Sequence, residues 1–251
     1  MRSFVLLLAL VPSLAWGAIS FVASGAKAGG TSGTSMAPAL PAGIVVGDVV
    51  IAISAARETA YAHTTSTTGW TVKYDGATTN LRYMVAWMRY SGNETAPTIT
   101  RGTGAQAWVG YTFAVRGVWQ IGDPFDAVST WTQGTTSPFT STAATTASDN
   151  AWAVAVLISG GAGSLPVQTI STGSVATATN LLQNQTQSAT TNRIVISAWR
   201  GSAAIASSGT STGTQAITWT NTTSNYSGGA IFTLRMDPAY PYTGGMSGFS
   251  P

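Results

Sequence analysis

The feature that most constrains this chain is a series of short runs of β-branched and aromatic residues, each ended by Gly, Ser, Thr, Asn or Pro. No long stretch has the periodicity of an amphipathic helix. Several runs alternate, as where Val109, Tyr111 and Phe113 lie opposite Gly110 and Thr112. Small residues on the second face are typical of a sheet that is packed on one side and nearly buried on the other. Roughly twelve such strands in about 220 residues predict an all-β fold, a two-sheet antiparallel β-sandwich of jelly-roll type.

The composition predicts a polar surface with little charge. Charged residues make up 8% of the chain, against about 25% in ordinary soluble domains, and Thr, Ser, Asn and Gln supply the polarity instead. The net charge of +3 comes from basic residues without a basic run, so we expect no nucleic-acid partner. The chain has no cysteine, which excludes disulfides, thiolate metal sites and cysteine nucleophiles.

Residues 1–17 form a hydrophobic leader of the kind found in secretory signal peptides. Arg2 supplies a short positive region, Phe4–Leu14 is apolar, and the small residues Ala15 and Gly17 suit cleavage after Gly17. The alternative is a buried N-terminal strand. The leader is short for a membrane span and no stop-transfer pattern follows, so we expect no span in the mature chain.

The remaining chain divides into a β-sandwich domain over residues 18–237 and a Gly/Pro-rich C-terminal tail over residues 238–251. The tail cannot continue a strand, and we expect it on the surface or on a partner. Some strand ends are alike, as in Phe113-Ala-Val-Arg-Gly and Phe232-Thr-Leu-Arg-Met. These matches are too short to establish a duplicated half-domain, and we interpret each Arg as snorkelling at a strand end.

Few residues are candidates for chemistry, and we expect neither catalytic residues nor a cofactor. His63 is the only histidine, and we expect it in an exposed loop without a chemical role. Asp123 and Asp126 are the only close carboxylates, in Gly122-Asp-Pro-Phe-Asp. A turn capped by Asp is the favoured interpretation, while a Ca²⁺ site and acid–base glycoside hydrolysis are the alternatives.

Three tryptophans, Trp119, Trp131 and Trp219, lie near predicted strand edges and are candidates for a binding face on which a sugar ring would stack. Exposed aromatic rings bind sugars in this way in lectin-like sites. Four other tryptophans lie inside predicted strands and are expected in the core or half-buried: Trp87, Trp108, Trp152 and Trp199.

A series of motifs in order resembles a β-sandwich domain found in tailed-phage virion proteins (tail-fibre, minor tail and head-decoration components) and in secreted bacterial proteins. The resemblance covers about residues 18–160 and implies a virion surface protein with no catalytic residues to carry over. The leader departs from the usual pattern of such domains. The motifs are Ile19-Ser-Phe-Val-Ala, Pro41-Ala-Gly-Ile-Val-Val-Gly-Asp-Val-Val-Ile-Ala, Gly69-Trp-Thr-Val, Met84-Val-Ala-Trp-Met-Arg-Tyr, Ala96-Pro-Thr-Ile-Thr, Ala114-Val-Arg-Gly-Val and Asp123-Pro-Phe-Asp.

We therefore expect a non-enzymatic virion structural protein of a tailed phage, exposed on the surface and receptor-facing. Its expected partners are other virion proteins or copies of itself, with a cell-surface glycan as a further ligand. The alternative is a bacterial adhesin or carbohydrate-binding protein, secreted after cleavage of the leader. An enzyme such as a depolymerase is the least favoured class.

Overall fold

The computed structural model describes residues 19–58, 61–77, 81–102, 106–135, 139–161, 168–171, 178–188, 193–201, 204–214, 216–219 and 226–238. All of the regular structure in these ranges is β-strand, which confirms the predicted all-β class. Within them, no helix is long and apolar enough to cross a membrane. The leader and most of the C-terminal tail lie outside the described residues, so both remain predictions.

The first half of the chain forms one main sheet and one small sheet, both antiparallel. The main sheet has the order β1-β9-β4-β7-β6, and β2 also pairs with β9. The small sheet has the order β3-β8-β5. The strands are β1 (Ser20–Ser24), β2 (Ala28–Gly30), β3 (Ser35–Met36), β4 (Val49–Ala56), β5 (Thr64–Thr65), β6 (Thr71–Ala77), β7 (Arg82–Arg89), β8 (Ile99–Thr100) and β9 (Trp108–Arg116).

The second half also forms one main sheet and one small sheet. The main sheet has the order β10-β18-β13-β16-β15, with β11 also paired to β18, and the small sheet has the order β12-β17-β14. The strands are β10 (Phe125–Val128), β11 (Thr132–Gly134), β12 (Phe139–Thr140), β13 (Trp152–Gly161), β14 (Gln168–Ser171), β15 (Ala178–Ser188), β16 (Arg193–Gly201), β17 (Ala216–Trp219) and β18 (Tyr226–Leu234).

The two halves have the same strand arrangement. Adding nine to each strand number of the first main sheet gives the order of the second, and the pairing of β2 with β9 becomes that of β11 with β18. The same shift turns β3-β8-β5 into β12-β17-β14. The described part of the chain therefore contains two structural repeats, repeat 1 from β1 to β9 and repeat 2 from β10 to β18. The short sequence matches at strand ends did not establish this repetition.

The pairing register agrees between the repeats at the level of single residues. In repeat 1, Val115 of β9 pairs with Val49, the first residue of the central strand β4. In repeat 2, Leu234 of β18 pairs with Trp152, the first residue of the central strand β13. A register shift at a β-bulge follows at the same place in both repeats, in β1 opposite Val115 and in β10 opposite Leu234. Val115 and Leu234 are therefore equivalent positions.

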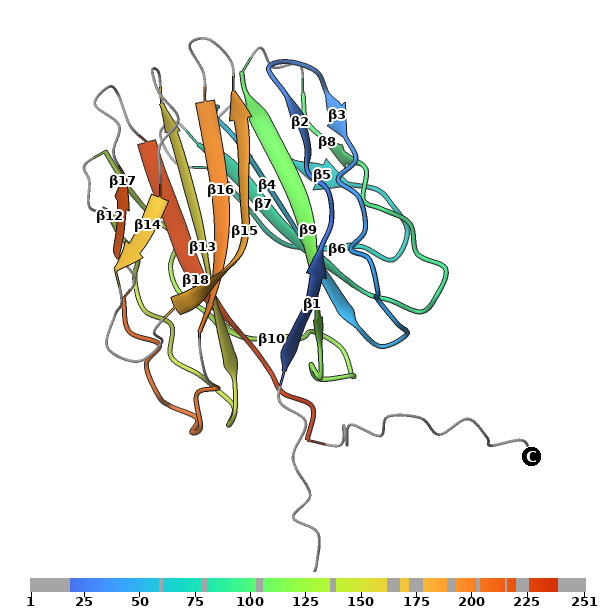
Figure 1. Cartoon of the computed structure of the whole chain (residues 1–251), viewed down its shortest axis with the longest axis vertical. Helices are drawn as coiled ribbons and strands as arrows, with labels where there is room; N and C mark the ends of the chain where they lie inside the picture. Colours follow the sequence, from blue (N-terminus) through green and yellow to red (C-terminus); the bar gives the residue numbers. More distant parts are fainter. Residues whose placement is uncertain are drawn as a thin grey trace, which may run out of the picture.

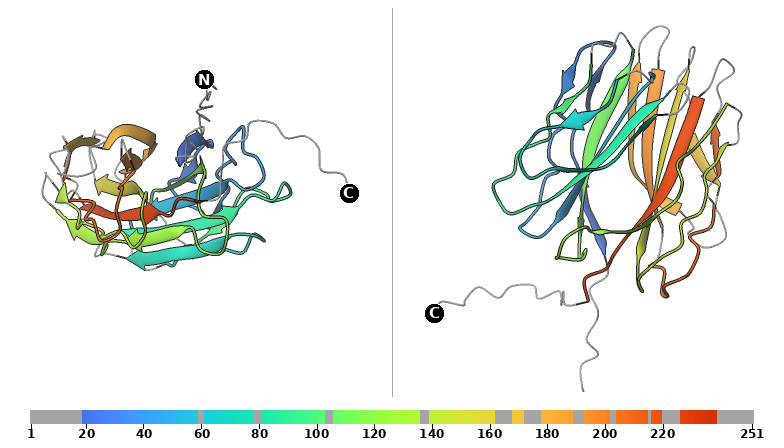
Figure 2. Two further views of the ribbon diagram at one scale, coloured as in Figure 1. Left: turned by 90° about the horizontal axis from the view of Figure 1, so that it is seen from below. Right: turned by 180° about the vertical axis from the view of Figure 1, so that it is seen from behind.

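The two main sheets face each other across the largest apolar core, and the small sheets lie on the outer sides (Figures 1 and 2). Alternate strand residues fill this core, for example Phe113 from β9 and Phe232 from β18. The intervening residues, such as Trp108 and Ile231, face the outer clusters of repeats 1 and 2 respectively. The predicted alternation with both faces covered is confirmed, because each main sheet packs on two sides.

The sandwich-like all-β fold is confirmed, but connectivity of jelly-roll type is not. Each main sheet takes all its strands from one half of the chain, repeat 1 or repeat 2. The halves are joined where the ends of β9 and β18 meet, through a bridge between Val118 and Met236. Both β9 and β18 thus end at one end of the molecule, beside the start of β1 (Figure 1).

Candidate functional site

In repeat 1, the aspartate and arginine of two resemblance motifs form a buried ion pair. Arg116 donates from Nε to Oδ1 and from Nη2 to Oδ2 of Asp48, each at 2.8 Å. The Asp48 side chain is 1% exposed, and its Oδ2 also accepts the backbone N–H of Val45 at 2.9 Å. Gly47 has a φ of 95°, a conformation in which glycine carries no steric penalty. This network fixes the loop that enters β4 against the end of β9.

Repeat 2 has the arginine without this aspartate. Arg235 follows Leu234 as Arg116 follows Val115, whereas the residue before the central strand is Ala151 in place of Asp48. The Nε of Arg235 is buried and has no hydrogen-bond partner among the described residues. The guanidinium instead lies over the Trp119 ring, 5.6 Å from the ring centroid. Its Nε–H therefore lacks the hydrogen bond that the Nε–H of Arg116 makes to Asp48.

Asp126 supplies the negative charge next to Arg235 from a different strand. Its carboxylate, whose side chain is 0% exposed, lies 4.0 Å from Arg235 Nε. It also accepts hydrogen bonds from the Ala147 N–H at 2.8 Å, from Ser148 Oγ at 2.5 Å and from Thr233 Oγ1 at 3.2 Å. Asp126 therefore fixes the loop before β13 and balances the charge of Arg235 without binding it in the bidentate manner of Asp48.

Asp123, the neighbouring carboxylate of the predicted turn, has other partners. Its Oδ1 accepts the backbone N–H of Phe125 at 3.0 Å, as expected for an Asp that caps its own turn. Its Oδ2 forms an ion pair with Lys73. No group of three or more His, Cys, Asp or Glu side chains that could hold a metal occurs in the described ranges. The Ca²⁺ site at Asp123 and Asp126 stays a prediction.

A hollow of about 510 Å³ opens beside Arg235, and we call it the Trp119 hollow. It is lined by both polar and apolar groups. Asp149 uses Oδ1 to accept the N–H of Ser208 at 2.7 Å. Asn150 has a φ of 56° and occupies the position of Gly47 in repeat 1. The lining residues are Trp119, Ala147, Ser148, Asp149, Asn150, Arg235, Met236 and Pro238.

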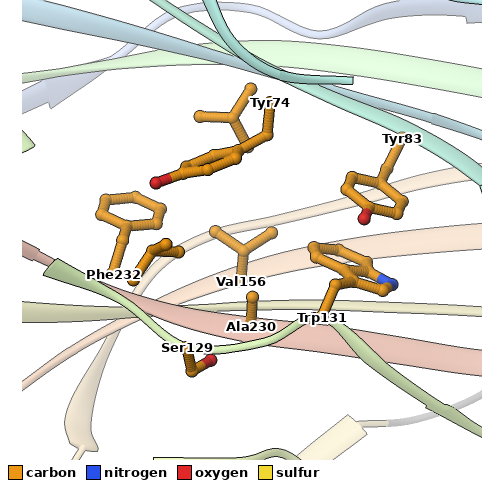
Figure 3. A pocket seen from close by; sticks show the side chains of 9 residues that line it. Tyr74, Tyr83, Ser129, Trp131, Val156, Ala230 and Phe232 are labelled. Atoms are coloured by element: carbon orange, nitrogen blue, oxygen red, sulfur yellow. The ribbon is translucent and has the colours of Figure 1, made fainter. Parts of the chain in front are cut away.

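Trp131 lines a different pocket, of about 240 Å³, between the two main sheets (Figure 3). One face of its ring stacks on Tyr83, with centroids 3.5 Å apart and planes 11° from parallel. The pocket walls are mainly apolar and include Val156 and Phe232. Burial raises the pKa of Tyr74, another wall residue, to about 12, so its hydroxyl is neutral at physiological pH. This is a hydrophobic gap between the sheets rather than an open platform for a sugar.

The third tryptophan candidate, Trp219, ends β17, but its side chain lies outside the described part of the chain. The four tryptophans expected in the core lie as predicted. Trp108 and Trp152 are buried, and Trp87 and Trp199 are half-buried. For Arg235 the sequence predicts snorkelling at a strand end, and its one signal for a further role is the likeness of its strand end to that of Arg116.

The prediction that His63 is exposed is wrong. His63 is 0% exposed, and its Nδ1 lies 2.9 Å from the Ser54 hydroxyl on β4. Burial and the nearby Arg101 and Arg82 lower its pKa from 6.5 to about 3. Its ring also meets Trp108 edge-on, with centroids 5.9 Å apart. The neutral imidazole thus attaches the loop before β5 to the outer face of the repeat 1 main sheet.

Comparison with family models, with curated proteins and with solved structures finds no match for this chain.

Proposed function

We propose that this protein is a non-enzymatic structural component of a tailed-phage virion, exposed on the particle surface. The observation that carries the proposal is that side chains of the resemblance motifs bind other groups of the same chain and so stabilise the fold. Asp48 and Arg116 form an ion pair with each other, in which the carboxylate is buried. Trp70 donates from Nε1 to the carbonyl of Thr95 at 3.0 Å. Motif residues with such roles support a scaffold that presents a surface. The proposed sandwich is of jelly-roll type and assembles with virion proteins or copies of itself.

The test is mass spectrometry of purified particles and of the soluble secreted fraction, aimed at peptides between Arg2 and Lys27. The proposal expects the protein in washed particles at a constant ratio to the major capsid protein. Protein found only in the secreted fraction, with a mature start at Ala18, would refute the virion role.

The second candidate is an exported adhesin or carbohydrate-binding protein, and the Trp119 hollow favours it. An aromatic ring, a guanidinium and a carboxylate around one open hollow are the groups with which proteins hold sugars. The same fractionation separates the two candidates, because only the exported protein would be cleaved and absent from particles.

A further inference from the structure

We infer that the Trp119 hollow binds a neutral saccharide, whose hydroxyl oxygens accept hydrogen bonds from the exposed part of the Arg235 guanidinium. The inference rests on the proposed role as a non-enzymatic surface protein and gives that role a ligand class. It applies to both the virion component and the exported form.

The comparison of the two repeats is the first step. In repeat 1 the guanidinium of Arg116 donates hydrogen bonds to both carboxylate oxygens of Asp48. In repeat 2 the side chain at that position is reduced to the methyl group of Ala151, and Arg235 is 39% exposed. The arginine of repeat 2 thus has a longer ion pair, with Asp126, and lies beside a hollow.

The charge of the ligand follows from the acidic groups around Arg235. Asp126 lies 4.0 Å from the guanidinium and already balances its charge, and Asp149 is a second carboxylate on the wall of the hollow. A ligand carboxylate would be repelled by both. Uncharged oxygen acceptors would meet no such repulsion, and they can accept hydrogen bonds from the exposed guanidinium N–H groups of Arg235.

The remaining wall residues offer hydrogen-bonding groups for the hydroxyl groups of a sugar and an apolar surface for its C–H groups. Asp149 accepts one backbone hydrogen bond and has further acceptor capacity for ligand hydroxyl groups. The amide of Asn150 can both donate and accept. The Trp119 ring offers an apolar surface for the C–H face of a sugar, and a volume of about 510 Å³ lies within the range usual for small-ligand sites.

The experiment measures binding of the full-length protein to an immobilised panel of neutral gluco-, galacto- and manno-trisaccharides and to trigalacturonate. Trp119→Ala removes the platform. Ala151→Asp places a carboxylate at the position equivalent to Asp48, where it would compete with a ligand for the Arg235 guanidinium. Arg200→Gln is the matched control, because Arg200 also lies over a tryptophan ring, that of Trp152, at 5.5 Å from the centroid.

We expect at least one neutral trisaccharide to bind, and binding to weaken about tenfold or more in Trp119→Ala. Ala151→Asp should abolish binding in a protein that still folds, with a melting temperature below that of the parent because the buried Asp126 carboxylate already lies beside Arg235, and Arg200→Gln should bind like the parent. Failure of every neutral trisaccharide to bind, tighter binding of trigalacturonate, or full binding by a folded Trp119→Ala protein would overturn the inference. Particle fractionation is independent of these results, so absence from particles would refute the virion proposal alone.

Discussion

Lowering the pH from 8 to 5 should destabilise this protein through one residue, His63. The chain has no other histidine, so few groups besides it titrate in this range. The folded protein holds His63 neutral, with a pKa lowered from 6.5 to about 3 by burial first and by Arg101 and Arg82 second. Arg101 forms an ion pair with Glu58 next to the same cluster, at 2.8 Å.

The sign and size follow from linkage between protonation and folding. Below pH 6.5 the unfolded chain binds a proton at His63 that the folded chain rejects until about pH 3. Stability is therefore complete above pH 6.5 and falls as the pH drops, by about 1.4 kcal/mol for each pH unit. At pH 5 the loss is about 2 kcal/mol, before the carboxylates begin to titrate.

The assay is urea unfolding followed by tryptophan fluorescence at pH 8, 7, 6 and 5. The control is His63→Asn, whose amide can still hydrogen-bond to Ser54 but does not titrate. The variant should be less stable at pH 8, and its free energy of unfolding should change little between pH 8 and pH 5. A parent protein with no pH dependence, or a variant that keeps the parent's slope, would refute the burial argument.

Three further predictions test packing and charge by the same unfolding assay at pH 7.5. Arg116→Met should cost about 2–3 kcal/mol, because it leaves the buried carboxylate of Asp48 uncompensated; a neutral effect would contradict the ion-pair network. Ala230→Val should stabilise by about 1 kcal/mol, because it fills the pocket beside Trp131. The same change at Ala155, in the closely packed outer cluster, should destabilise, and equal effects would show that the pocket is not there. Gly25→Ala should cost about 2 kcal/mol or more, because a Cβ there would collide with the carbonyl oxygen of Ala39. A variant that unfolds at the same midpoint urea concentration as the parent would contradict this close contact.

The sequence by itself determined the fold class and most of the strand faces. Alternation in the runs around Phe113 and Val156 places these residues in the core between the main sheets, as observed. The turn at Asp123 was also predictable, because an Asp side chain commonly accepts the backbone N–H of the residue two positions later, here Phe125. Such features depend on neighbours in the chain, which is the information that a single sequence carries.

Only the tertiary structure revealed the repeats and the site. The equivalence of Arg116 and Arg235 depends on pairing register, which is set by contacts between strands far apart in the chain. The burial of His63 also depends on a distant partner, because Ser54 and the main sheet cover a loop that is polar in sequence. The Trp119 hollow follows the same rule, because it lies beside Arg235, whose equivalence to Arg116 is set by strand pairing and not by any long sequence match.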